Sequence, residues 1–353
     1  MEKIFKSLAN DRVMLIGGAG FIGHHLALKL AEGGVSVMVF DNLMVNSLIK
    51  QLYGLKKNNL VSNLYLSFLM ERLEKMREAG VTFSNGDARI TRDMNEVIQL
   101  YKPTKVVHLA AIASAVEAKK NPGLSFELQL NTLQPLLEFC RINPRVINQV
   151  VLLSSSTVYG DFETLSVDES TRPRPRGIYA NTKYMAERLV RTYCHQYGLN
   201  TAIIRPSALY GERCVSRRVS QVFIENALNG KPLFLEGGGD GRLDFTYIHD
   251  LIDGIIRAMA FRVEKPGGTA TYNITCGNAR TILELANIVK NMVPSAILEE
   301  KPRAEDKPIR GTLSVLRAEN EIGFKAKWPL EEGYKKYCEW YIENWNRVKL
   351  LSS

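Results

Sequence analysis

Cysteine is scarce in this chain of 353 residues, and its few copies follow no pattern. The five cysteines do not stand at the spacings of metal ligands, and an odd number cannot all pair in disulfides. Such a set suits a reducing compartment, so we expect a cytoplasmic protein without a metal site.

Long hydrophobic runs are also missing. Residues 1–12 are polar and charged, without the apolar segment of a signal peptide. The longest uncharged apolar stretch near the expected core, residues 106–116, is too short to span a bilayer and lies between Lys105 and Glu117. We therefore expect no membrane-spanning segment.

Strong segregation of charge is absent as well. The net charge is +9, but the basic residues are dispersed, and we expect their isolated pairs to be solvated surface rather than a nucleic-acid site. The pairs are Lys56-Lys57, Lys119-Lys120, Arg217-Arg218 and Lys335-Lys336. The hydrophobic content of 45% and charged content of 24% are typical of a soluble globular protein of one large or two modest domains.

A glycine-rich turn is the clearest motif that the sequence does contain. Gly17, Gly20 and Gly23 follow the apolar residues 13–16 and precede the helical pattern of residues 26–30. Such a turn can cradle a dinucleotide pyrophosphate, because its free N–H groups and the positive end of the helix dipole face the phosphates.

An acidic residue ends the second apolar run, residues 35–40. Asp41 stands near the spacing after Gly23 at which a carboxylate accepts hydrogen bonds from the adenosine ribose. A carboxylate there repels a 2′-phosphate, and no arginine follows it at once. The sequence therefore predicts NAD rather than NADP as the cofactor.

Apolar runs alternate with helical patterns through the first two-thirds of the chain. The runs are residues 13–16, 35–40, 81–84, 106–109, 150–154 and 201–205. This alternation predicts an α/β fold with a doubly wound parallel sheet. Beyond residue 206, glycines and prolines break the regularity and indicate a smaller cap. We place the nucleotide-binding domain at residues 1–205 and the cap mainly at residues 206–353, with some segments returning to the first domain.

Residues 43–80 form an insertion between two of the expected strands. Its apolar residues recur at helical spacing opposite charged ones, which predicts an amphipathic helix packed on the body or on a partner subunit. The apolar positions are Leu66, Leu69, Met70, Leu73 and Met76.

Three Tyr-x-x-x-Lys pairs occur, and we expect one of them to be catalytic. Tyr179 and Lys183 open a clean helical stretch shortly after the strand end that carries Ser155, and residues four apart share a helix face. The pairs that begin at Tyr53 and Tyr101 lie in the insertion or contain a proline that disrupts the helix.

Proton transfer explains why a lysine is needed beside the tyrosine. Bringing a phenol pKa from near 10 to about 7 requires about 4 kcal/mol of differential stabilisation. We expect the Lys183 ammonium to supply much of it, and the Ser155 hydroxyl to hydrogen-bond the substrate oxygen that loses its proton.

The motifs together resemble an extended short-chain dehydrogenase/reductase of the nucleotide-sugar epimerase and dehydratase family. They are residues 17–23, 41–43, 86–88, 108–111, 154–160, 179–183, 205–206, 210–211 and 244–247, in the family's order. Arg303 and Asp306 are similar to a late element whose arginine grips the nucleotide diphosphate. The resemblance implies a Rossmann-type fold with a smaller C-terminal substrate-binding cap, NAD, a nucleotide-diphosphate sugar as substrate, and a homodimer with a four-helix interface.

The resemblance also implies a role for each matching residue. The catalytic set is Ser155, Tyr179 and Lys183. The residues implied to bind NAD are Gly17, Gly20, Phe21, Ile22, Gly23, Asp41, Asn42, Asp87, Ala88, Leu109, Ala110, Ala111, Tyr179, Lys183 and Pro206. The residues implied to bind the substrate are Ser114, Ser156, Thr157, Ser207, Ala208, Arg242 and Arg303.

Several departures from the family pattern bear on the reaction. Ala208 replaces an asparagine that commonly contacts substrate, Arg242 is displaced by one position, and His249 stands where aspartate is common. Dehydratases of the family resemble one another in an acidic pair where this chain has Ser156 and Thr157. The resemblance therefore favours an NAD-dependent epimerase acting at C4 through a transient 4-keto intermediate. A 4-oxidase or dehydratase that releases a keto sugar, and a non-catalytic NAD-binding or RNA-binding protein, are the alternatives.

Overall fold

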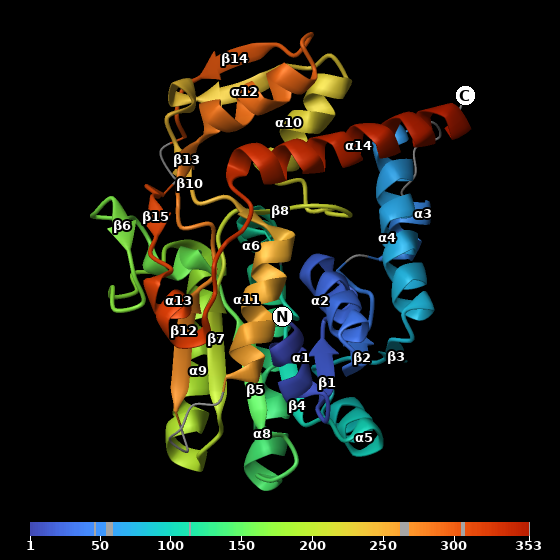
Figure 1. The fold of residues 1–353 in the computed structure, drawn as a ribbon, viewed down its shortest axis with the longest axis vertical. Helices are drawn as coiled ribbons and strands as arrows, with labels where there is room; N and C mark the ends of the chain where they lie inside the picture. Colours follow the sequence, from blue (N-terminus) through green and yellow to red (C-terminus); the bar gives the residue numbers. More distant parts are fainter. Residues whose placement is uncertain (46, 54–58, 113, 262–267, 305–307, 353) are drawn as a thin grey trace.

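A seven-stranded parallel β-sheet forms the centre of the molecule (Figure 1). The computed structural model describes residues 1–45, 47–53, 59–112, 114–261, 268–304 and 308–352. The strand order is β3-β2-β1-β4-β5-β7-β12. The strands are β1 (Arg12–Ile16), β2 (Ser36–Asp41), β3 (Thr82–Asn85), β4 (Lys105–His108), β5 (Gln149–Leu153), β7 (Thr201–Arg205) and β12 (Thr269–Asn273). The predicted Rossmann-type fold is confirmed.

Helices cover both faces of this sheet because successive strand residues point to opposite sides. Val13 and Leu15 of β1 pack in one cluster with α1, α2 and α11, whereas Met14 and Ile16 pack in another with α5, α8 and α9. The first set is α1 (Glu2–Leu8), α2 (Phe21–Glu32) and α11 (Ile248–Ala260). The second set is α5 (Thr91–Tyr101), α8 (Gln134–Ile142) and α9 (Gly177–Tyr197).

In the part of the insertion that the structure describes, two helices follow β2, α3 (Leu48–Tyr53) and α4 (Leu60–Glu78). α4 packs on α2 and on the C-terminal helix α14 (Leu330–Ser352), which crosses it in Figure 1. The predicted apolar face is partly wrong, because Met70 is 57% exposed whereas Arg72 belongs to the buried side. The body of the same chain covers that side, and a buried cation within it needs polar partners.

Short elements surround the main sheet. Among the described residues, four strand pairs lie outside it, namely β8–β11, β9–β14, β10–β13 and β6–β15, while α11 and β12 return to it. The short strands are β6 (Ser166–Val167), β8 (Leu209–Tyr210), β9 (Leu233–Glu236), β10 (Arg242–Leu243), β11 (Thr246–Tyr247), β13 (Arg280–Thr281), β14 (Leu298–Lys301) and β15 (Thr312–Leu313). The remaining helices and turns are α6 (Ala115–Lys120), α7 (Pro122–Phe126), η1 (Glu127–Asn131), η2 (Ser156–Tyr159), α10 (Val219–Leu228), η3 (Gly237–Gly239), α12 (Ile282–Met292) and α13 (Leu316–Ile322). Within the described ranges, no helix is long and apolar enough to cross a membrane.

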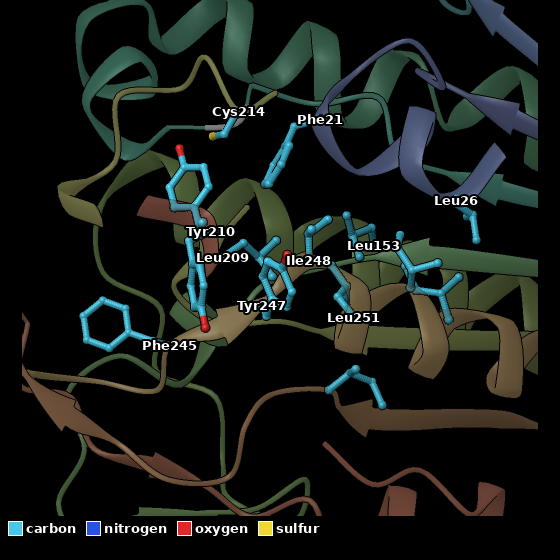
Figure 2. Packing of buried hydrophobic residues seen from close by; sticks show 14 of the residues in the cluster. Phe21, Leu26, Leu153, Leu209, Tyr210, Cys214, Phe245, Tyr247, Ile248 and Leu251 are labelled. Carbon is cyan, nitrogen blue, oxygen red and sulfur yellow. The ribbon is translucent and has the colours of Figure 1, made fainter. Parts of the chain in front are cut away.

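The largest hydrophobic cluster joins the sheet to the segment that follows β8. Figure 2 shows Phe21 of α2 together with Cys214 and Tyr210 in this cluster. Tyr210 stacks on Tyr247 with ring centroids 5.4 Å apart, and both side chains are almost completely buried. The segment after β8 is therefore packed close to the helix that begins at the glycine turn.

Candidate active site

A cleft of about 680 Å³ opens where β1, β2, β3 and β4 end. Open α/β sheets bind ligands beyond the carboxyl ends of their strands. The lining includes most residues expected to bind NAD, namely Gly17, Gly20, Phe21, Ile22, Gly23, Asp41, Asn42, Asp87, Ala88, Leu109, Ala110 and Ala111. Pro206, Tyr179 and Lys183 lie outside this lining.

Three glycines shape the turn between β1 and α2. Gly17 has a φ of +76°, and a Cβ there would lie 2.7 Å from the amide nitrogen of Ala110. A Cβ at Gly23 would lie 2.4 Å from the carbonyl oxygen of Gly18, whereas one at Gly20 would meet that of Gly17 at 3.3 Å. Since Gly20 directly precedes α2, the turn fits a pyrophosphate held by backbone N–H groups at a helix N-terminus.

Asp41 at the end of β2 is fixed by the backbone. Its carboxylate accepts hydrogen bonds from the N–H groups of Ala19 at 3.0 Å and Leu43 at 2.8 Å. Burial raises the pKa of Asp41, and these hydrogen bonds oppose that rise. Each carboxylate oxygen keeps a second lone pair, so the group can also accept from ribose hydroxyls. The residues present therefore fit NAD.

Asp87, which follows β3, lies in a small ion network at the cleft. Arg89 donates to its carboxylate at 2.6 Å and holds the pKa of Asp87 below its ordinary value. Asn42 donates to the same carboxylate at 3.2 Å, and Arg89 also pairs with Glu127 at 2.7 Å. This network holds Asp87 in place at the side of the cleft where the resemblance implies that the adenine binds.

The three side chains expected to react come from two elements. Ser155 follows β5, whereas Tyr179 lies in the first turn of α9 and Lys183 lies one turn later. Tyr179 packs against an apolar cluster whose Ile112 and Leu128 line the cleft. Tyr179 therefore packs behind residues that line the cleft without lining it itself.

Electrostatics at Tyr179 differ from the expectation. Burial raises the pKa of the phenol, while the charge of Arg218 and, to a smaller extent, the Ser155 hydroxyl lower it. Lys183 donates from Nζ to the Leu153 carbonyl oxygen at 2.8 Å, and burial lowers the pKa of its ammonium to about 7. In this structure the charge that lowers the pKa of Tyr179 is that of Arg218, and the catalytic assignment of Lys183 stays a prediction.

The small polar residues expected at the substrate lie in different surroundings. Ser114 lines the cleft and caps α6. Thr157 donates from its hydroxyl to the Ser155 Oγ at 3.0 Å. Ser156 and Ser207 are buried. The hydroxyls of Ser155 and Thr157 are thus hydrogen-bonded to each other at the strand end beside Tyr179.

The two arginines expected at the nucleotide phosphates are exposed. Arg242 of β10 donates to the Ala279 carbonyl oxygen at 3.3 Å, and Arg303 lies beside Gly237. Neither lines the cleft, and Asp306 lies outside the described residues. Ala208 has a φ of +33°, so its backbone is unusual although its side chain is small.

Sequence reasoning missed the segment between β8 and α10. Val215, Ser216, Arg217 and Arg218 all line the cleft. The prediction of a solvated basic pair is wrong for Arg218, which is only partly exposed and lies close enough to Tyr179 to act on its charge. The available signal was a basic pair shortly after the Tyr-Gly motif at residues 210–211.

Comparison with known proteins agrees with this geometry. The model of the NAD dependent epimerase/dehydratase family matches residues 13–275. The chain belongs to this family. UDP-glucuronate 4-epimerase 1 of Arabidopsis thaliana is 30% identical to this family member over 347 residues, which cover 94% of this chain and 76% of that protein.

Two further relatives match along nearly their whole length. A putative UDP-glucose 4-epimerase of Methanocaldococcus jannaschii is 29% identical over 342 residues, which cover 95% of this chain and 100% of that protein. The crystal structure of the Thermus thermophilus UDP-glucose 4-epimerase in complex with NAD matches with a TM-score of 0.76 at 27% identity, covering 93% of this chain and 98% of that one. This family member is an NAD-dependent enzyme, and the geometry of its glycine turn and of Asp41 fits that cofactor.

Proposed function

We propose that this chain is a 4-epimerase of a UDP-linked sugar. Its relatives are named UDP-glucuronate and UDP-glucose 4-epimerases, and the Thermus structure holds NAD. A UDP-hexose and a UDP-uronic acid are therefore the substrates to test first. The name of the family supports epimerisation and dehydration equally, so the choice between them depends on the site.

Tyr179 is the base in this proposal. It removes the proton of the C4 hydroxyl, Ser155 donates a hydrogen bond to the same oxygen, and Arg218 stabilises the phenolate. When bound, NAD would supply reversible uptake of the C4 hydrogen with its electron pair, which leaves a ketone at C4 that can take the hydrogen back on its opposite face. Tyr179 holds the proton and gives it back to the oxygen, while Thr157 keeps the Ser155 hydroxyl in place.

The residues after Ser155 favour epimerisation over dehydration. Removing water from the sugar needs a further acid and base besides Tyr179. Ser156 is buried with its N–H donating to the Pro206 carbonyl oxygen, and Thr157 is hydrogen-bonded to Ser155. Neither position offers a carboxyl group, which supports a reaction that needs Tyr179 as its one proton-transfer group.

An isotope experiment tests the proposal. The purified protein is incubated in D₂O with UDP-glucose and, separately, UDP-glucuronic acid, and the product is examined by mass spectrometry and NMR. The C4 hydrogen is not exposed to solvent in a 4-epimerase, so the product should be inverted at C4 without deuterium on carbon. Deuterium at C3, C5 or C6, release of a keto sugar, or NAD binding without turnover of either compound would each contradict the proposal.

We also propose that the chain is a cytoplasmic homodimer that pairs through α8 and α9. Ile142 of α8 is 65% exposed, and Met185 and Tyr197 of α9 are 43% and 47% exposed. Apolar side chains at these levels on two adjacent helices favour a self-complementary contact. Sedimentation at micromolar concentration should give a dimer, and a monomer would contradict this part of the proposal.

A further inference from the structure

Arg72 of the insertion helix α4 is an unusual buried cation. Its side chain is 1% exposed, yet no carboxylate lies within 4 Å of its guanidinium in the part of the chain that the structure describes. Its partners are carbonyl oxygens instead. Nε and Nη2 both donate to the carbonyl of Arg213, at 3.1 Å for Nε, and Nη1 donates to that of Ala19 at 3.5 Å. One side chain thus links the glycine turn to the segment after β8.

That segment, residues 212–218, has a backbone that needs external support. Arg213 and Arg217 have φ values of +59° and +48°, although neither is glycine. A left-handed conformation costs a non-glycine residue about 1–2 kcal/mol. Contacts from the surrounding structure must therefore hold the segment in this shape.

The supporting contacts come from α2 and α4. Arg213 donates from Nε to the His24 Nε2 at 3.0 Å, and its Nη1 pairs with Glu71 at 3.2 Å. His24 is buried and its other ring nitrogen contacts the Gly20 carbonyl oxygen at 2.9 Å, so its proton lies on Nδ1 and Nε2 accepts. The His25 ring nitrogen Nε2 contacts the carbonyl oxygen of Glu212 at 3.0 Å.

Residues 212–218 contribute four side chains to the lining of the cleft. Val215, Ser216, Arg217 and Arg218 line the cleft, and Arg218 directly precedes α10. Arg72 itself does not line the cleft. A substitution of Arg72 can therefore affect turnover through the position of residues 212–218, and not through a contact between Arg72 and the substrate.

From this geometry we infer that Arg72 is a positioning residue, which holds residues 212–218 in the shape that places Arg218 beside Tyr179. The inference rests on the proposed function for its kinetic consequence, because Arg218 matters to turnover when Tyr179 is the base. It also gives the insertion a role, since α4 carries both Arg72 and Glu71.

The test compares Arg72→Lys with Arg77→Lys, a conservative change at an exposed position of the same helix. Lysine keeps the charge at position 72 but cannot donate from two nitrogens to one carbonyl. We expect amides of residues 212–218 to exchange with deuterium about tenfold faster in Arg72→Lys, while those of β5 keep their protection. Arg77→Lys should match the parent. Unchanged exchange in a folded Arg72→Lys protein would overturn the inference.

Kinetics give a readout that a general loss of stability would not produce. In Arg72→Lys, kcat should fall about tenfold and the rising limb of its pH profile should move to higher pH, while NAD affinity changes less than about threefold. Adding Arg72→Lys to Arg218→Gln should lower kcat little beyond Arg218→Gln alone, because the first change acts through the second residue. Additive losses would overturn the inference.

A substitute variant and the exchange comparison keep the role of Arg72 testable if Arg72→Lys does not fold or if the proposed function is wrong. If Arg72→Lys does not fold, Glu71→Gln loosens the same segment from its half-buried side, and the same exchange pattern is expected. A parent protein that turns over no UDP sugar would contradict the proposed function. The exchange comparison would still decide whether Arg72 positions the segment.

Discussion

The proposed site has a reacting end, at Ser155 and Lys183, and a nucleotide end, where Arg242 and Arg303 are the candidate ligands of the substrate's phosphates. The two ends differ in how firmly the protein holds their polar groups. Ser155 and Lys183 are 8% and 4% exposed and lie at the junction of β5 and α9. Arg242 and Arg303, the candidate phosphate ligands, are exposed on short elements outside the main sheet. In the proposed site, the reacting groups are therefore held in place by the protein itself, whereas the candidate phosphate ligands are not.

A buried ion pair accounts for the firmness of the reacting end. Glu187 of α9 accepts from Arg205 of β7 at 2.9 and 2.6 Å and from the Ser154 hydroxyl at 2.5 Å. These bonds join α9, β7 and β5 directly beside Ser155. Breaking such a pair by removing one partner typically costs about 3–5 kcal/mol. Arg242 has no carboxylate within 4 Å among the described residues, so nothing comparable fixes it.

The largest effect is expected from Tyr179→Phe. Because the phenol is the proposed proton-transfer group, its loss should lower kcat by about 10²–10⁴-fold while NAD affinity and the melting temperature stay close to those of the parent. Steady-state kinetics and NAD titration measure this. Tyr53→Phe is the matched control, since Tyr53 is 89% exposed. A larger loss in the control than in Tyr179→Phe would show that the wrong tyrosine was chosen.

Lys183→Met should change how stability depends on pH. Burial lowers the pKa of Lys183 from 10.5 to about 7, so between these values the unfolded chain binds a proton that the folded chain does not. Stability of the parent relative to Lys183→Met should therefore rise with pH, by about 2 kcal/mol from pH 7 to 9. Urea unfolding at several pH values measures it. Lys75→Met, an exposed change, should show no such trend, and parallel curves for parent and Lys183→Met would refute a depressed pKa.

The cofactor half of the site is predictable because it is local in sequence. Gly17, Gly23 and Asp41 lie at strand ends whose apolar runs are visible, and backbone geometry alone requires glycine at the first two. Tyr179 and Lys183 are found by helical spacing. These signals need no knowledge of what packs against them.

The shape of residues 212–218 is not predictable in this way. Arg218 acts on Tyr179 only because residues 212–218 adopt a shape set by contacts from α2 and α4, which lie far away in sequence. The buried side of α4 was partly missed for a related reason: periodicity favours Met70, whereas Arg72 is buried by hydrogen bonds to carbonyls that the sequence does not show.

The smallest effects are expected at the nucleotide end. Exposed charges contribute about 0.2–1 kcal/mol each, so Arg242→Ala and Arg303→Ala should each raise KM about twofold to fivefold and leave kcat nearly unchanged. Lys301→Ala, an exposed change two positions from Arg303, is the control and should leave both constants at the parent values. Raising the salt concentration should increase KM in the parent more than in either arginine variant, because screening weakens the same exposed interaction. A hundredfold loss of kcat in either arginine variant would break the comparison between the two ends, since that arginine would then be needed in the transition state and not only in binding.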